Sequence, residues 1–63
     1  MDATEIKDRL NRSPYHQLHG VQVRLEGEQI VLTGVVTSFY FKQLAQEAVR
    51  SNGTPVDNRL EVL

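Results

Sequence analysis

Two histidines three residues apart are the first side chains in this sequence that could bind a metal or move a proton. His16 and His19 would face the same side of a helical turn, so both imidazoles could approach one ion. A zinc or copper site needs more than two protein ligands, yet the chain has no cysteine and no acidic residue between Ser13 and Leu25. We therefore predict no metal site and no cofactor, and we interpret both histidines as pH-sensitive surface groups.

Carboxylates and hydroxyls are the other groups that could do chemistry. Glu26 and Glu28 lie in a predicted turn, where water surrounds them, whereas acid–base catalysis needs a pocket that shifts pKa values. The serines Ser13, Ser38 and Ser51 lack the strand, turn and helix that expose a nucleophile. Because a chain of 63 residues has little material for a pocket, we predict that it is not an enzyme.

The charge pattern bears on the class of partner. Seven Lys and Arg oppose eight Asp and Glu, for a net charge of −1, and the two signs are interspersed. Nucleic-acid binding needs a basic surface, so we predict no nucleic-acid partner. No apolar stretch reaches the roughly 18 residues of a transmembrane helix, and the N-terminus lacks the pattern of a signal peptide. We expect a soluble chain, cytoplasmic as written or part of a longer protein.

The elements that must position these side chains follow from the spacing of apolar residues. Recurrence at i, i+3 and i+4 indicates a helix, and alternation with period two indicates a strand. Proline and glycine separate the segments, because proline cannot continue a helix and glycine accepts turn geometry. These rules predict, in order, a helix over residues 2–12, a short turn over 15–18, strands over 21–25 and 30–36, a helix over 38–51 and a strand over 57–63.

This order predicts an α+β fold, α-β-β-α-β, in a single domain over residues 1–63. A strand–helix–strand crossover is nearly always right-handed and makes its two strands parallel. We therefore predict a three-stranded mixed sheet, with the 30–36 strand in the centre and two helices packed on one face. The predicted core comprises Ile6, Leu10, Leu18, Val21, Val23, Leu25, Ile30, Leu32, Val36, Phe41, Leu44, Ala45, Ala48, Val49, Leu60 and Val62.

The opposite face of this sheet would be open. Val31, Thr33 and Val35 then form an apolar strip along the central strand, with Arg24 and Arg59 on either side. An apolar strip with a charged rim is typical of a protein contact surface. The alternative is that the arginine stems lie over the valines and hide them. Both interpretations stay open, and so does the oligomeric state.

A second candidate site follows from the predicted topology. The short turn over 15–18 and the start of the 38–51 helix meet at one edge of the sheet, around the amide groups of the helix N-terminus. Such groups attract phosphate. The candidate site for an anion or a lipid headgroup comprises Tyr15, His16, His19, Phe39, Tyr40 and Lys42. The alternative is that Tyr15 packs on Phe39 or Tyr40 and nothing binds.

Gly34 lies in the middle of the predicted central strand. Glycine inside a strand usually lets another backbone or a helix come close. A phosphate-binding loop instead places its glycines before a helix. We therefore predict a packing role for Gly34.

An ordered set of glycines and apolar residues runs through the last forty residues. It comprises Gly27, IVLTGVV over 30–36, Ser38, Lys42, Ala45, Gly53 and VDNRLEV over 56–62. This set resembles the BON domain family of bacteria, in which a turn glycine, V-x-L-x-G-x-V, a polar-capped helix, a glycine and V-x-N-x-L-x-V follow one another. The chain departs from the pattern at Thr54, where valine is usual. The spacing from Gly53 to Asn58 is one residue shorter than typical, which predicts a tighter last loop.

The resemblance implies a non-catalytic binding or association module. The family is linked to bacterial envelope and osmotic-stress proteins, and to attachment to phospholipid membranes or large assemblies. Its matching positions are scaffold positions, so no binding residue carries over. Two functions stay open: attachment to a phospholipid membrane or another envelope component, and protein–protein interaction or self-association through the open sheet face.

Overall fold

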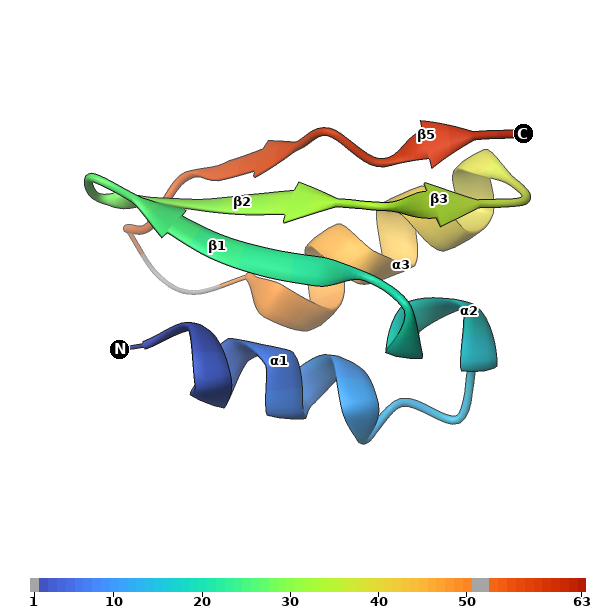
Figure 1. The fold of residues 1–63 in the computed structure, drawn as a ribbon, viewed down its shortest axis with the longest axis horizontal. Helices are drawn as coiled ribbons and strands as arrows, with labels where there is room; N and C mark the ends of the chain where they lie inside the picture. Colours follow the sequence, from blue (N-terminus) through green and yellow to red (C-terminus); the bar gives the residue numbers. More distant parts are fainter. Residues whose placement is uncertain (1, 51–52) are drawn as a thin grey trace.

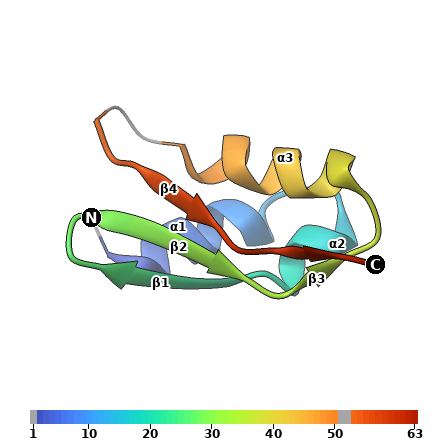
Figure 2. The same ribbon diagram turned by 90° about the horizontal axis from the view of Figure 1, so that it is seen from above.

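The computed structural model, which describes residues 2–50 and 53–63, has helices on one side of a sheet (Figures 1 and 2). Its elements are α1 (Ala3–Asn11), α2 (His16–His19), β1 (Gln22–Glu26), β2 (Gln29–Thr33), β3 (Val35–Val36), α3 (Phe39–Val49), β4 (Val56–Asn58) and β5 (Glu61–Val62). Figure 1 shows α1 below the strands and α3 behind them, and Figure 2 looks from above onto the strands, with α1 beneath them and α3 beside β4. Because α1 contacts both α3 and β1, and α3 contacts β4, the two helices cover the same side of the sheet. The predicted α+β fold with a mixed sheet is confirmed.

Side-chain caps set where the two longer helices begin. Asp2 Oδ1 accepts a hydrogen bond from Glu5 N at 2.9 Å, and Ser38 Oγ accepts one from Phe41 N at 3.3 Å. Each cap satisfies one of the amide groups that a helix leaves unpaired in its first turn. The predicted last residue of the second long helix, Ser51, lies outside the described residues.

The three-stranded sheet has the order β1-β2-β4. β1 and β2 form an antiparallel hairpin, and the two-residue turn between them begins at Gly27, whose φ of 60° suits the first position of a type II′ turn. β2 and β4 are parallel, with Ile30 beside Val56 and Leu32 beside Asn58. The crossover through α3 therefore joins parallel strands, as predicted.

Both predicted long strands are interrupted, which the periodicity did not indicate. Gly34, with a φ of 132°, separates β2 from β3, and Leu60 lies in the gap between β4 and β5. Val35 pairs with Glu61, so the register of the parallel pair is the same on both sides of the break. A Cβ at residue 34 would lie 3.4 Å from Gly20 O, which confirms the predicted close approach of a neighbouring backbone.

The core lies between the sheet and the helices, where the predicted apolar faces meet. Two predictions were wrong. Leu25 is 37% exposed, because the hairpin extends past the ends of the helices (Figure 1), and Val31 is fully buried although it points to the other face. Val56 packs against the core and was not predicted. The buried apolar residues are Ile6, Leu10, Leu18, Val21, Ile30, Val31, Leu32, Val36, Ala45, Val49 and Leu60.

Candidate functional site

Val31, at one end of the apolar strip predicted on the open sheet face, is covered by other side chains and is fully buried. Arg24 on β1 and Asp57 on β4 are the register neighbours of Val31. Arg59 Nε lies 2.8 Å from Asp57 Oδ2, and Arg59 Nη2 lies 3.6 Å from Glu26 Oε2 on the far strand. Arg24 Nη2 approaches Glu26 Oε1 at 3.2 Å. Of these ion pairs, the one between Arg59 and Glu26 crosses the central strand, and it joins the residue after β4 to β1.

The prediction that Val31 is an accessible contact residue is therefore wrong. Long side chains from both flanking strands meet above one narrow strand, and their apolar stems exclude water from the valine beneath. Thr33 is half-buried, and Val35 is 50% exposed at the far end of the strip. What is left of the strip is Val35, which belongs to a different surface.

That surface begins with an aromatic cluster between α2 and α3. The ring centroid of Tyr15 lies 6.4 Å from that of Tyr40 and 5.8 Å from that of Phe41, and Tyr40 lies 5.6 Å from Phe41. A hydrogen bond with the Tyr15 side chain raises the pKa of Tyr40 above its ordinary value, and charge repulsion from Tyr15 acts in the same direction. Tyr15 thus packs on Tyr40, while Phe39 is not part of these ring contacts and is 75% exposed.

Hydrogen bonds hold α2 against the rest of the fold. Lys7 Nζ donates to the carbonyl oxygens of His19, at 2.7 Å, and Val21, at 2.5 Å. Gln17 and Thr37 exchange two hydrogen bonds, of 2.9 Å between side chains and 3.1 Å from the Thr37 amide. The edge formed by α2 and the start of α3 is therefore a fixed surface.

The two histidines are neighbours, with ring centroids 5.4 Å apart. His19 Nε2 lies 2.7 Å from the carbonyl oxygen of Ser13, which can only accept, so this nitrogen carries a proton and does not face a metal. No group of three or more potential ligands occurs among residues 2–50 and 53–63. His16 is exposed beside the aromatic cluster.

Exposed large hydrophobic side chains gather at one end of the molecule. α2, β3, the start of α3 and the C-terminal end of β5 meet there (Figure 1). Leu63 N donates to Val36 O at 2.9 Å, which fixes the last residue beside β3. Leu63 is 83% exposed, and the other members are 39–75% exposed. We call this surface the apolar end; it comprises Tyr15, Val35, Phe39, Tyr40 and Leu63.

Sequence reasoning found only part of this surface. It placed Tyr15, Phe39 and Tyr40 at a common edge but assigned Val35 to the sheet face and omitted Leu63. The alternation over 57–63 does put Leu63 on the face opposite the helices. That signal could have found Leu63, but only the register of β3 with β5 brings it near the start of α3.

Carboxylates are scarce around the apolar end. The sequence has no Asp or Glu between residues 9 and 25 or between 29 and 46, so α2, β3 and the first two turns of α3 carry none. Glu61 on β5 is the exception. Lys42 lies one turn into α3, where the described residues provide no ion-pair partner for its ammonium group. The side-chain carboxylates of the chain therefore lie mostly away from the apolar end.

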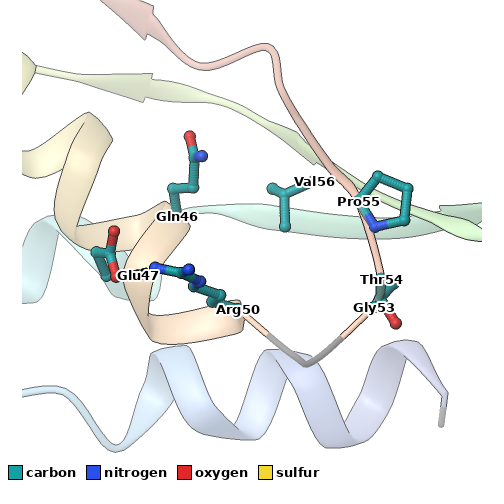
Figure 3. Close-up of a pocket in the computed structure, with 7 residues that line it drawn as sticks. All are labelled: Gln46, Glu47, Arg50, Gly53, Thr54, Pro55 and Val56. Carbon is teal, nitrogen blue, oxygen red and sulfur yellow. Dashed lines mark ion pairs between the residues drawn. The ribbon is translucent and has the colours of Figure 1, made fainter.

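An open groove lies towards the other end, between the C-terminal half of α3 and the start of β4 (Figure 3). Its volume is about 600 Å³. Glu47 and Arg50 within it pair with each other at 3.6 Å, both largely exposed, so neither is set up as an acid or base. Sequence reasoning did not identify this groove. Its lining residues are Gln46, Glu47, Arg50, Gly53, Thr54, Pro55 and Val56.

The structure thus defines a small α+β domain with an apolar end and a polar groove. The model of the BON domain family matches residues 2–63, and the chain belongs to this family. BON domains are non-catalytic, binding-type domains associated with membrane and envelope proteins. Neither the curated proteins nor the solved structures include a match. Within the described part of the chain, no helix is long and apolar enough to span a bilayer.

Proposed function

We propose that this domain attaches reversibly to anionic phospholipid surfaces through its apolar end. The observation that carries the proposal is the exposure of Phe39, Tyr40, Val35 and Leu63 on one end of a molecule whose carboxylates lie mostly elsewhere. Aromatic side chains with one apolar and one polar side are favoured at the membrane interface. This end offers such side chains on a rigid support.

The geometry suggests how the contact forms. Phe39 enters the interfacial layer, and the hydroxyl groups of Tyr15 and Tyr40 stay at the level of the headgroups. Lys42 and the amide groups at the start of α3 face lipid phosphates. Burial of one large apolar side chain contributes about 1.5–3 kcal/mol, and one lysine near an anionic surface adds about 1 kcal/mol. Binding by one domain is therefore weak.

Co-sedimentation with vesicles tests this proposal. We expect the chain to pellet with vesicles of phosphatidylglycerol and phosphatidylcholine, and less with phosphatidylcholine alone. Phe39→Ser should reduce pelleting severalfold, because it removes the most exposed aromatic side chain. Leu25→Ser is the matched control, since Leu25 is also an exposed hydrophobic residue but lies at the hairpin end. Equal pelleting of both variants would exclude the apolar end as the binding surface.

Self-association through the open sheet face receives no support from the geometry. The ion pairs above Val31 cover the centre of that face. A charged network of mixed sign, partly exposed to water, provides neither an apolar contact nor a strong field. We therefore retain membrane attachment as the single proposed function.

A further inference from the structure

β4 has a strand on only one side. It is an edge of the β1-β2-β4 sheet, and its partner is β2. Ile30 N donates to Pro55 O, and Arg59 N donates to Leu32 O, both at 2.9 Å, so the odd-numbered residues of this segment turn their backbone groups towards β2. Because backbone direction alternates along a strand, the N–H and C=O groups of Val56 and Asn58 point outward.

Of the two residues with outward backbone groups, Val56 lines the groove, and Asn58 follows it along β4 beyond the lining residues. Gln46, Glu47 and Arg50 on α3 form one wall, and the segment that ends at Val56 forms the other (Figure 3). The start of the β4 edge, with its unpaired backbone donor and acceptor, thus lies on one side of the open groove, and α3 lies on the other. Such an arrangement has room for one more extended chain.

Asn58 sets the length of this free edge. Its Nδ2 donates to Lys42 O at 2.9 Å and to Gln46 Oε1 at 3.2 Å, and its Oδ1 accepts from Leu60 N at 3.2 Å. The next outward amide, that of Leu60, is therefore already satisfied within the chain. The edge that is free to pair runs from Val56 to Asn58 and suits a short partner.

We propose that the groove binds a short extended peptide, which adds to the sheet as a strand beside β4. Main-chain hydrogen bonds to Val56 and Asn58 supply the common part of the affinity. Half-buried Val56 favours a small aliphatic side chain opposite it. Glu47 and Arg50 neutralise each other, so the groove attracts a neutral peptide more than a phosphate or a polyanion.

The other sheet edge, β1, is less suited to this role. Lys7 Nζ already donates a hydrogen bond to the carbonyl oxygen of Val21, just before the start of that edge. The groove described above borders β4 alone. The peptide site goes beyond membrane attachment and lies away from the apolar end, so a vesicle-bound domain keeps the groove open to water (Figure 1).

A selection experiment supplies the probe. Random heptapeptides displayed on phage are enriched on the 63-residue chain, and the most enriched peptide is synthesised. We expect it to shift the amide resonances of Val56 and Asn58 in the ¹⁵N-labelled chain, and to show cross-strand nuclear Overhauser effects with both residues. Phe39→Ser should leave this binding unchanged, which separates the peptide site from the proposed membrane function.

Backbone methylation provides the decisive variant. The chain is short enough to synthesise, and an N-methyl group on the Asn58 amide removes an outward donor without touching the ladder to β2. We expect affinity for the selected peptide to fall at least about tenfold, through the lost hydrogen bond and the added bulk. N-methylation of Leu25, an outward position on β1 by the hairpin register, is the control and should change affinity less than about twofold.

Four outcomes would overturn the proposal. They are the enrichment of no peptide, shifts confined to residues outside the groove, an affinity unaffected by methylation of Asn58, and a dimer with intermolecular contacts between two copies of β4. The Overhauser effects are measured on the unmodified chain. The proposal therefore stays testable even if the methylated chain folds poorly.

Discussion

At the scale of single residues, a few side chains replace the packing that a four-residue helix cannot provide. A short helix such as α2 leaves its last carbonyl groups without partners inside the helix. Lys7 from α1 donates hydrogen bonds to the carbonyl oxygen of His19, the last residue of α2, and to that of Val21 just after it. His19 completes the link through the Ser13 carbonyl. Lys7 and His19 carry groups that could take part in binding or catalysis, but their hydrogen bonds stabilise the fold. His16 is the histidine that remains exposed.

His16 gives the first residue-scale prediction, which concerns pH. Histidine generally gains a positive charge as the pH falls from 7.5 to 5.5, and a positive charge on α2 adds attraction to an anionic surface. Binding to phosphatidylglycerol vesicles should therefore rise at pH 5.5. His16→Gln should abolish part of that rise and leave binding at pH 7.5 unchanged. Vesicle co-sedimentation at the two pH values measures both, and an unaltered pH response in the variant would contradict the prediction.

At the scale of elements, the paired breaks in the strands show how the sheet accommodates its neighbours. Gly34 ends β2 where the backbone at Gly20 comes close, and Leu60 lies in the matching gap of the last strand. Because both strands break at the same register position, the parallel pairing resumes at Val35 without a shift. The two short strands that follow bring Val35 and Leu63 to the apolar end.

Gly34→Ala tests this arrangement. A φ of 132° is strained for any residue with a Cβ, and the added atom would lie 3.4 Å from Gly20 O and 3.6 Å from Leu60 Cδ2. We expect the free energy of unfolding to fall by about 1–3 kcal/mol. Gly20→Ala is the control: its φ is −90° and its Cβ would meet nothing within 4 Å, so its effect should stay within about 0.5 kcal/mol. Urea denaturation measures both, and equal stability of the two variants would refute the account.

At the scale of the whole molecule, the two candidate surfaces lie apart along an axis of 28 Å. The N-terminal end of α3 belongs to the apolar end and its C-terminal half to the groove (Figure 1). One helix therefore connects a surface suited to lipid with a surface suited to a peptide. A domain attached by Phe39 would stand with its hairpin and groove directed away from the bilayer.

This orientation is itself a prediction. In vesicles that carry a lipid with a paramagnetic headgroup, the amide resonances of Phe39 and Tyr40 should broaden most, and those of Gly27 and Thr54 least. The expected order follows from their positions at opposite ends of the molecule. Uniform broadening, or strongest broadening at the hairpin, would show that the domain binds lipid in another orientation or without a preferred one.

The sequence by itself determined the order of the elements, the mixed topology and most of the core. Those features depend on local patterns: Ile6 and Leu10 share a helix face, and Ile30 and Leu32 share a strand face, whatever lies opposite them. The aromatic edge was also predictable, because Phe39 and Tyr40 directly follow the central strand. The break at Gly34 was not, since a single glycine in an apolar run is compatible with a continuous strand.

Only the tertiary structure decided which candidate surfaces are exposed. Val31 looks accessible from its own strand, and it is buried because Arg59 on one edge reaches Glu26 on the other. Leu63 joins the apolar end because the parallel register places it beside Val36. Alternation tells which way a side chain points. It does not tell which side chains from distant segments cover it, because that depends on how separate strands are paired.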